Sequence, residues 1–520
     1  MKSKKKKYVH KVGVLGKIFS YNFLIALLFI LQIVIIILSA LYLYEKYYIY
    51  YWVDLALRAI ALFVIMASSS QQPYKMAWLI VITLFPIVGA AIYLIVRTDL
   101  HLPILKKKDR IQQNEIKSIQ TQKEGVIDEL DANDPRYSGL ANYLSSSIGF
   151  PLYSNNNLSY FSSGEGSLES ILNSLRSAKK FIFIEFFIVK DGFFLQEILD
   201  ILVEKVKNGV EVKFMYDGSN EITNVPRSYK RYLNKLGIET RVFKPFKTPL
   251  FHRENNRNHR KSIIVDGVVA YTGGINIGDE YLNKVKRFGY WKEAVIKVEG
   301  ESVNSFTLSF LGMWDMFAKT SLKKEDYLVY EQTQFPESQN FVAPFSDSPV
   351  DTDDVGFDVY IDIINKAVRY VYISTPYLVI GDDFMNALKY ASKRGVEIRI
   401  LVPFIPDKII PNNIAKSHYR ELMDAGIKVY EYTPGFNHAK IVLSDDSIFV
   451  VGSINLDYRS FYLSFENAVL AYDPKTALVI KEDLENCYKN SNLIDEESIK
   501  KISKFKIFIG YLSWLLSPLL

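Results

Sequence analysis

The chain has 520 residues, a formal net charge of +6 and one cysteine, and 49% of its residues are hydrophobic. Its length exceeds that of a single typical domain, and one cysteine excludes both an intramolecular disulfide and a cysteine-rich metal site. A charge of +6 suits an anionic lipid surface as well as nucleic acid, so by itself it excludes neither partner.

Two uncharged segments near the N-terminus predict membrane-spanning helices. Residues 18–44 and 76–96 contain no charged side chain over 27 and 21 positions, and a spanning helix needs about 20 apolar residues. The stretch 47–72 between them carries Asp54 and Arg58. These two are four residues apart and pair on one helix face, but burying them at the bilayer centre is costly. We therefore expect 47–72 to be an interfacial or re-entrant helix.

Basic residues flank both ends of this region, residues 1–100. Seven lysines precede the first segment, and a second group of basic residues follows the last: Arg97, Lys106, Lys107, Lys108 and Arg110. By the positive-inside rule both flanks are cytoplasmic, which requires an even number of crossings. The sequence thus predicts a multi-pass anchor with the rest of the chain in the cytoplasm. A third crossing through 47–72 is the alternative and places the rest outside.

The remainder predicts two similar α/β halves. After a polar linker at 101–135 that ends in a helix, residues 136–320 and 356–520 each show apolar strands alternating with amphipathic helices, which is typical of an α/β sandwich with a largely parallel or mixed sheet. The polar, proline-containing stretch 321–355 is the expected connection. Lysines followed by a short apolar run at 500–520 predict an interfacial helix on anionic lipid, and a terminal helix packed on the domain core is the alternative.

One polar pattern occurs once in each half. The first copy has His259, Lys261, Asp266 and Asn276, and the second copy repeats each of these residues 179 positions later, at His438, Lys440, Asp445 and Asn455. Short β-branched runs follow each lysine. On a strand, residues two apart share a face, so each histidine is expected beside its lysine. Each aspartate belongs to the catalytic pattern by position and is expected to close the turn between two strands.

These residue types suit the transfer of a phosphodiester group. Lysine and asparagine donors stabilise the charge that develops on phosphate oxygens, and a neutral histidine can act as a nucleophile or as an acid and base near pH 7. Two half-sites supply one histidine for each role. We expect no metal and no cofactor, because the lysines take the role of a divalent ion.

The paired pattern resembles the phospholipase D superfamily, and several segments resemble the bacterial cardiolipin synthases within it. These segments are 258–261, 273–281, 375–377, 437–440 and 455–460. One departure is Trp291-Lys292-Glu293, where those enzymes commonly have Trp-Arg-Asp; a bidentate contact of the arginine would be weakened. The resemblance implies two phospholipase D-like halves related by pseudosymmetry, with Glu293 and Glu466 as acidic residues that support the histidines.

The resemblance also implies an activity in a bacterial cell membrane. It implies transfer of a phosphatidyl group between two phosphatidylglycerol molecules through a phosphohistidine, with release of glycerol and formation of cardiolipin. His259 would be the nucleophile and His438 the acid and base, although pseudosymmetry leaves the reverse open. A phospholipase D-type hydrolase and an inactive membrane scaffold are the alternatives. The lipids are the expected partners, nucleic acid is not, and homo-oligomer formation stays open.

Overall fold

The computed structural model describes residues 47–68, 71–86, 89–90, 92–93, 102–244, 256–318, 321–330 and 338–519, with single positions at 30, 33, 34, 37, 41 and 335. The chain divides into two compact units. The first is Met1–Ile104 with Phe246–Asn255 and Tyr511–Leu520, and the second is Leu105–Pro245 with Asn256–Gly510. The predicted span at 18–44 lies almost entirely outside the described residues.

The first unit contains helices α3 (Tyr47–Met66) and α4 (Gln72–Leu84). Arg58 and Asp54 form the predicted pair on α3, with 2.7 Å between Nη2 and Oδ2. The helix predicted over 76–96 is interrupted: α4 ends at Leu84, Phe85 is not helical, and the described positions beyond it, 86, 89–90 and 92–93, are helical again. Pro86 accounts for the break, because the residue before a proline disfavours the helical conformation. Among the described residues, no helix has both the length and the apolarity for crossing a bilayer. The two-span anchor stays a prediction.

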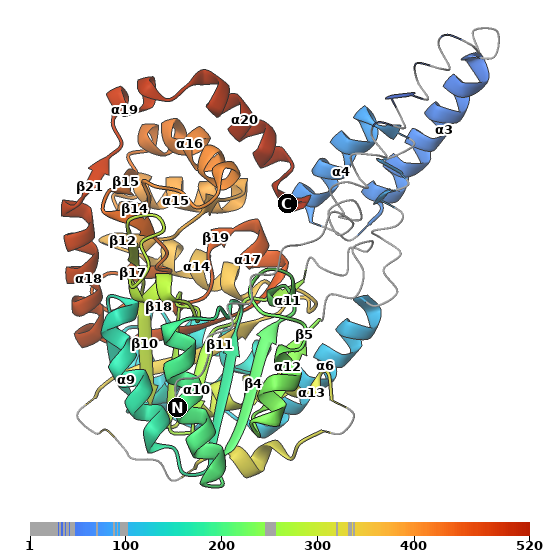
Figure 1. Ribbon diagram of the computed structural model, residues 1–520. Helices are drawn as coiled ribbons and strands as arrows, with labels where there is room; N and C mark the ends of the chain where they lie inside the picture. The colour runs from blue at the N-terminus through green and yellow to red at the C-terminus, as the bar shows by residue number, and fades with distance from the viewer. Residues whose placement is uncertain are drawn as a thin grey trace. The chain divides into compact units, whose positions relative to one another are not determined.

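The second unit contains two large mixed sheets (Figure 1). In spatial order the first sheet comprises β2 (Asn157–Phe161), β10 (Val295–Glu299), β8 (Val269–Gly273), β7 (Ser262–Val265), β3 (Phe181–Phe186), β4 (Glu211–Asp217) and β5 (Glu239–Phe243). The main path of the second comprises β1 (Tyr153–Ser154), β11 (Phe341–Asp347), β20 (Ser464–Tyr472), β18 (Ile448–Gly452), β17 (Ile441–Ser444), β12 (Tyr370–Ser374), β14 (Glu397–Pro403), β15 (Lys428–Tyr432) and β21 (Ser491–Leu493).

The same connection builds both sheets, which confirms the predicted α/β class. In the first sheet β3, β4 and β5 run parallel, joined through α10 (Phe193–Lys207) and α12 (Tyr229–Lys235), and β7, β8 and β10 then add antiparallel strands. In the second, β12, β14 and β15 run parallel through α15 (Asp382–Lys393) and α16 (Ile409–Asp424). Every residue of β3 and β12 is buried, as expected for central strands covered on both faces.

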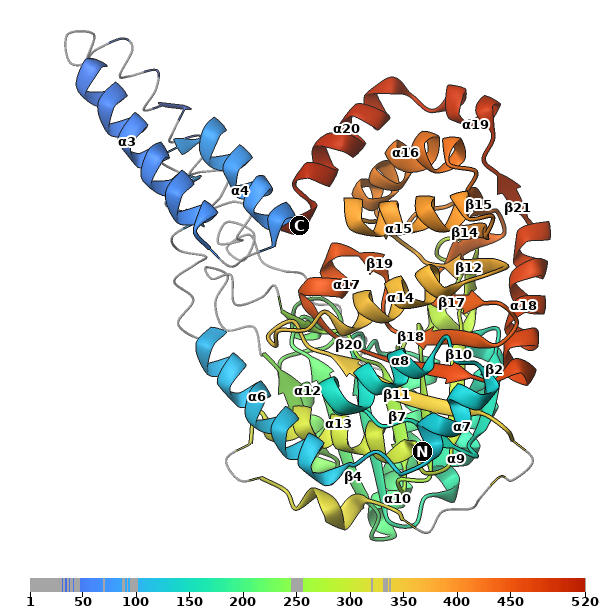
Figure 2. The same cartoon turned by 180° about the vertical axis from the view of Figure 1, so that it is seen from behind.

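The two sheets meet through corresponding strands. Strand β8 contacts β18 and β20, and β10 contacts β18. Both views show β10 beside β18 (Figures 1 and 2). One helix of each half also reaches the other half, since α13 (Val303–Asp315) contacts β11 and α18 (Pro474–Lys489) contacts β2. This exchange brings the two copies of the polar pattern to one interface.

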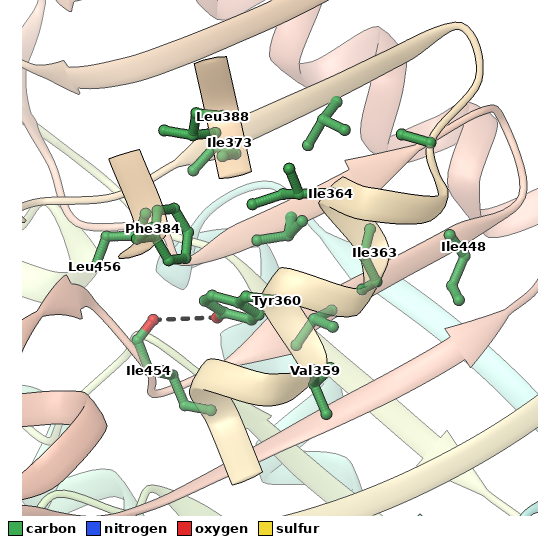
Figure 3. Packing of buried hydrophobic residues seen from close by; sticks show 14 of the residues in the cluster. Val359, Tyr360, Ile363, Ile364, Ile373, Phe384, Leu388, Ile448, Ile454 and Leu456 are labelled. Carbon is green, nitrogen blue, oxygen red and sulfur yellow. Dashed lines mark hydrogen bonds between the residues drawn. The ribbon is translucent and has the colours of Figure 1, made fainter. Parts of the chain in front are cut away.

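A large apolar core supports the second copy of the pattern (Figure 3). Helix α14 (Val355–Lys366) contributes Val359 and Ile363, which are buried with Phe384 of α15. The hydroxyl of Tyr360 on α14 donates a hydrogen bond to the carbonyl of Ile454 at 3.3 Å. Because Ile454 precedes Asn455, this bond fixes the backbone that presents the asparagine.

The segments expected to be linkers contain regular structure. Residues 101–135 form α6 (Leu102–Ile119) and α7 (Val126–Asn133), and α7 buries Val126 and Leu130 in the core of the second half. Within 321–355 lies β11, a strand inside the second sheet. Polar composition suggested connections here, but the apolar residues within each stretch are enough to pack against the neighbouring core.

Candidate active site

Each motif histidine is held by a short parallel bridge to the other half. Strand β6 (Arg257–Asn258) pairs with the start of β20, and the backbone N–H of His259 donates to the carbonyl of Phe465 at 2.9 Å. Strand β16 (Gly435–Asn437) pairs with β9 (Tyr290–Lys292), and the backbone N–H of His438 donates to the carbonyl of Lys292 at 2.8 Å. The expected strand begins only after each lysine, so the histidines lie in the link between a bridge and a strand.

The residue that follows each accepting carbonyl, after Phe465 or after Lys292, is a glutamate. This glutamate contacts the side chain of the same histidine. Nδ1 of His259 lies 2.9 Å from Oε1 of Glu466, and Nδ1 of His438 lies 2.6 Å from Oε1 of Glu293. Both glutamate side chains are fully buried. Each histidine is thus oriented by a carboxyl group from the opposite half, which leaves Nε2 as the ring nitrogen for chemistry.

The two histidines face one cavity of about 280 Å³. Asn276 and Asn455 also line it. Its charged walls are mainly basic: Lys190, Arg257, Arg287, Lys408 and Arg459, with Asp407 and Asp457 as the acidic residues. The backbone N–H of Ile188 donates to the amide oxygen of Asn276 at 3.0 Å. The amide oxygen of Asn455 is buried without a hydrogen-bond partner among the described residues, while its N–H donates to the hydroxyl of Ser460 at 3.1 Å. The unpaired oxygen can accept a hydrogen bond from a ligand hydroxyl.

Burial shifts the pKa values of the two histidines and of Glu466. It lowers the pKa of His438 to about 4 and that of His259 well below the usual 6.5, and the nearby lysines act in the same direction. Burial raises the pKa of Glu466 to about 7, opposed mainly by the charge of Lys261. Both imidazoles are therefore neutral at pH 7, the form that a nitrogen nucleophile requires.

The two lysines lie behind the histidines. Each Nζ donates to the backbone carbonyl of the histidine two residues before it, and both lysines are 1% exposed. Burial lowers the pKa of Lys261 to about 7 and that of Lys440 to about 8, while Glu466 and Glu293 oppose this shift. Below these pKa values both lysines are ammonium groups with little water around them, and they give the site a strong positive field for a phosphate.

The lysine pKa values predict an alkaline limit on activity. A lysine is charged below its pKa and neutral above it, so kcat/KM should fall above pH 7 to 8 by about tenfold per pH unit as the first ammonium is lost. The measurement is kcat/KM from pH 6 to 9.5 in vesicles whose lipid carries a constant charge over that range. A profile that stays flat to pH 9.5 would mean that neither lysine loses its proton.

Asp266 and Asp445, expected with the catalytic residues, do not join them. They follow β7 and β17, at the opposite end of these strands from the histidines, with φ of 53° and 54°. The carboxylate of Asp445 accepts hydrogen bonds from the backbone N–H groups of Val368, Arg369 and Tyr370 at 2.8 to 3.0 Å. Asp266 accepts three equivalent bonds at the start of β3. Both close the turn, as expected from their place between strands.

Replacing Asp445 with alanine should reduce stability more than chemistry. The change removes three charge-assisted bonds and a 2.5 Å ion pair with Arg136, and it leaves alanine in a left-handed backbone conformation. We expect the free energy of unfolding to fall by about 3 kcal/mol, with kcat per folded molecule within about twofold of wild type. Asp445→Asn, which tolerates this conformation, should lose less. A thermal-unfolding series with parallel kinetics tests this, and a thousandfold loss of kcat in a folded variant would contradict it.

A second pair of residues, one at the end of a central strand in each sheet, supports the site. Glu185 at the end of β3 accepts from the amide of Asn258 at 2.5 Å, and Ser374 at the end of β12 bonds with the amide of Asn437 at 3.0 Å. Each asparagine immediately precedes a motif histidine. β3 and β12 occupy corresponding places in the two sheets, and their ends hold the residue before each histidine.

The two half-sites differ around their glutamates. A Cβ on Gly274 would lie 2.3 Å from Oε2 of Glu293, so only glycine leaves room for that carboxyl group. The corresponding Ser453, 179 residues later, donates its hydroxyl to Oε2 of Glu466. The indole N–H of Trp291 donates to Oε1 of Glu293 at 2.9 Å. The chemical surroundings of the two histidines are therefore not equivalent.

Lys292, the departure from Trp-Arg-Asp, forms a buried ion pair with Asp483 on α18, with 2.7 Å between Nζ and Oδ2. It anchors the bridge strand that carries Glu293. Among the residues that the structure describes, no group of three or more His, Cys, Asp or Glu side chains is arranged to hold a metal ion.

Comparison with known proteins identifies the family. The chain matches the family model "Cardiolipin synthase, PLD-like domain" over residues 171–314 and 360–488, and "Phospholipase_D-nuclease N-terminal" over residues 56–97. It is 32% identical to a cardiolipin synthase of Halalkalibacterium halodurans over 88% of this chain and 91% of that protein. It is 41% identical to an uncharacterized protein of Streptococcus mutans over 85% of this chain and 96% of that protein.

Among solved structures, a phosphatidylserine synthase of Haemophilus influenzae superposes with a TM-score of 0.55 and 15% identity, over 73% of this chain and 96% of that one. At that identity the superposition supports the fold alone, and it agrees with the two mixed sheets described above. The extent of the family match, together with the identity to cardiolipin synthases over most of their length, carries the assignment. This chain belongs to the cardiolipin synthase family of the phospholipase D superfamily and is a phosphatidyltransferase.

Proposed function

We propose that this protein is a membrane-bound cardiolipin synthase that joins two phosphatidylglycerol molecules and releases glycerol. The observation that carries the proposal is the pair of buried histidines, each oriented by a glutamate of the opposite half, on one basic cavity. This arrangement gives a nucleophile and an acid on the two sides of a bound phosphodiester. A basic wall suits substrates that both carry a negative charge.

In the first step Nε2 of His259 attacks the phosphorus of one phosphatidylglycerol. A P–N bond forms, the P–O bond to the glycerol headgroup breaks, and protonated His438 gives its proton to the departing alkoxide. The anionic phosphate raises the pKa of His438 when it binds, which supplies the protonated form that the free enzyme lacks at pH 7. Lys261 and Lys440 stabilise the charge on the phosphate oxygens through their positive field from behind the histidines. Asn276 and Asn455 do so as amide N–H donors, and Asn455 exchanges its bond to Ser460 for one to the phosphate.

In the second step the headgroup hydroxyl of another phosphatidylglycerol replaces glycerol. Now neutral, His438 takes the hydroxyl proton as the oxygen attacks phosphorus, and the P–N bond to His259 breaks. Cardiolipin leaves, and both histidines return to their starting states. Because water is also a nucleophile, the transferase outcome requires the lipid hydroxyl to reach the phosphohistidine before water does.

The lipid substrates place the protein at a membrane, and two features support a multi-pass anchor. The uncharged segments 18–44 and 76–96 are long enough to span, and residues 56–97 match the N-terminal family model. Basic residues on both flanks favour two crossings and a cytoplasmic catalytic part.

Product analysis tests the proposal. Full-length enzyme is reconstituted in phosphatidylglycerol vesicles, and cardiolipin, glycerol and phosphatidic acid are measured together, with His259→Ala as the background. We expect equal amounts of cardiolipin and glycerol with little phosphatidic acid. Phosphatidic acid as the main product would identify a phospholipase D-type hydrolase instead, and no product would reject this lipid as the substrate.

A further inference from the structure

The connection from β14 to α16 forms part of the cavity wall. Asp407 and Lys408 line the cavity. The hydroxyl of Tyr377, which also lines it, donates to Oδ2 of Asp407 at 2.8 Å, and Nζ of Lys408 lies 4.9 Å from the centre of the Tyr377 ring. The polar side chains of this segment are therefore directed to the site.

The apolar side chains of the same segment are exposed. Phe404, Ile405, Ile409 and Ile410 have exposed fractions of 45%, 37%, 74% and 46%. Large aliphatic and aromatic side chains are usually buried, and several in a row on the surface mark a site of interaction with another apolar phase. We call these four residues the apolar lip.

Helix α20 (Lys504–Leu515) packs against the first turns of α16. A Cβ on Gly510 would lie 2.3 Å from the backbone oxygen of Asn413, so α20 crosses α16 in close contact there, one turn from the apolar lip. At about 100° per residue, Phe505 and Phe508 point away from that crossing, and they are 70% and 61% exposed. Two exposed lysines, Lys504 and Lys506, flank them.

The size of the cavity limits what it can enclose. Pockets that surround a drug-sized ligand have volumes of about 300–1,000 Å³, and this cavity has about 280 Å³. It holds a headgroup and the reacting phosphate but not two acyl chains. The chains of a bound phospholipid must therefore leave the cavity into an apolar phase at its edge.

We propose that the apolar lip docks into the surface of a bilayer that contains anionic phospholipid, with Phe505 and Phe508 as a second contact, so that substrate headgroups enter the cavity directly from the membrane. Apolar side chains that insert between headgroups, beside lysines that attract anionic lipid, are the usual combination for an interfacial surface. The inference rests on the proposed function, since it assumes a phospholipid substrate.

A fluorescent probe tests the contact in the full-length protein. The only cysteine, Cys487, is 5% exposed, so Ile409→Cys is labelled selectively with an environment-sensitive dye. Leu478→Cys on α18, at a position that is 55% exposed, is the matched control. In vesicles of equal parts phosphatidylglycerol and phosphatidylcholine, we expect a blue-shifted probe at 409 that spin-labelled lipid quenches at least twofold, and no quenching at 478.

Two results of the probe experiment would overturn the proposal. A probe at 409 that stays in water would show that the lip does not touch lipid. A blue shift without quenching by lipid would show contact with protein instead, such as a second copy of the chain. The probe measurement requires no turnover, so it reports lipid contact at the apolar lip even if the proposed function is wrong.

Turnover measurements on two substrates distinguish a loss of membrane docking from a loss of folding or of catalysis. The variant Ile409→Glu/Ile410→Glu should lower turnover of long-chain phosphatidylglycerol in vesicles at least tenfold and leave turnover of a short-chain, water-soluble phosphatidylglycerol within about twofold. The control Leu478→Glu/Val479→Glu carries the same charges at two similarly exposed positions and should change neither. Equal losses on both substrates would assign the lip a structural role and overturn docking. A wild type that uses neither substrate would reject the proposed function.

Discussion

His259→Ala should lose at least about four orders of magnitude in turnover of phosphatidylglycerol, because the proposed step that forms the P–N bond would have no nucleophile. The basic residues and asparagines that line the cavity are unchanged in this variant, so lipid binding should persist. The measurement is cardiolipin formation in vesicles, with binding followed separately by spin-labelled lipid. Turnover within tenfold of wild type would exclude His259 as the nucleophile.

His438→Ala should lose turnover because it lacks the general acid, and a substrate with a good leaving group tests this. General acid catalysis contributes about 10²–10⁴-fold when the leaving group is a poor one. A phosphatidyl ester of p-nitrophenol leaves without a proton, so His438→Ala should still release one equivalent of nitrophenol in a burst, whereas His259→Ala should release none. A burst from His259→Ala instead would reverse the two roles.

A second large loss is expected when a glutamate beside a histidine is changed. Glu466→Gln should lower kcat by about 10²–10⁴-fold. The carboxyl group contacts Nδ1 of His259 from the other half at 2.9 Å. A carboxylate accepts the Nδ1 proton and leaves Nε2 as the lone-pair nitrogen, while glutamine can donate to Nδ1 and stabilise the unreactive tautomer. Glu293→Gln should act in the same way on His438. The measurement is kcat for long-chain phosphatidylglycerol in vesicles.

A neighbouring glutamate serves as the matched control. Glu185 is 2% exposed and bonds with Asn258 without a hydrogen bond to either histidine, so Glu185→Gln retains an acceptor for that amide and should keep kcat within about tenfold. Equal losses for Glu185→Gln and Glu466→Gln would show that any change of charge near the motif is harmful, and would remove the support for a tautomer effect.

The repeat made much of the second unit predictable from the sequence. Two copies of a strand–helix pattern predicted two similar α/β halves, and the 179-residue spacing predicted that His259 and His438 belong to one site. The structure contains two mixed sheets built by the same connection, which confirms the α/β class, and both histidines line one cavity. Local patterning sufficed because alternation of apolar residues determines which face of each strand is buried.

The origin of each glutamate was not predictable, because it depends on pairing between halves. Glu293 follows the first motif in the chain but contacts the histidine of the second, and Glu466 does the reverse. The contacts arise from the two-residue and three-residue bridges β6–β20 and β9–β16. Such short pairings have no periodicity of their own, so the sequence showed two candidate acids but not their partners.

The two repeated aspartates have a structural role, although their spacing matches that of the histidines. Asp266 and Asp445 recur at the same spacing as the histidines, which suggested a shared chemical role. They recur instead because both halves need a carboxylate at a left-handed turn position to cap three backbone N–H groups. A repeated fold repeats its structural residues together with its catalytic ones.

The most direct test of the account is to map the covalent intermediate. Full-length enzyme is mixed briefly with phosphatidylglycerol that carries a labelled phosphate and is quenched in alkali, which preserves a phosphohistidine, and the labelled peptide is identified. The account predicts an acid-labile label on His259, absent from His259→Ala and accumulating in His438→Ala with the nitrophenyl substrate. Label on His438, or active enzyme that never carries label, would contradict it.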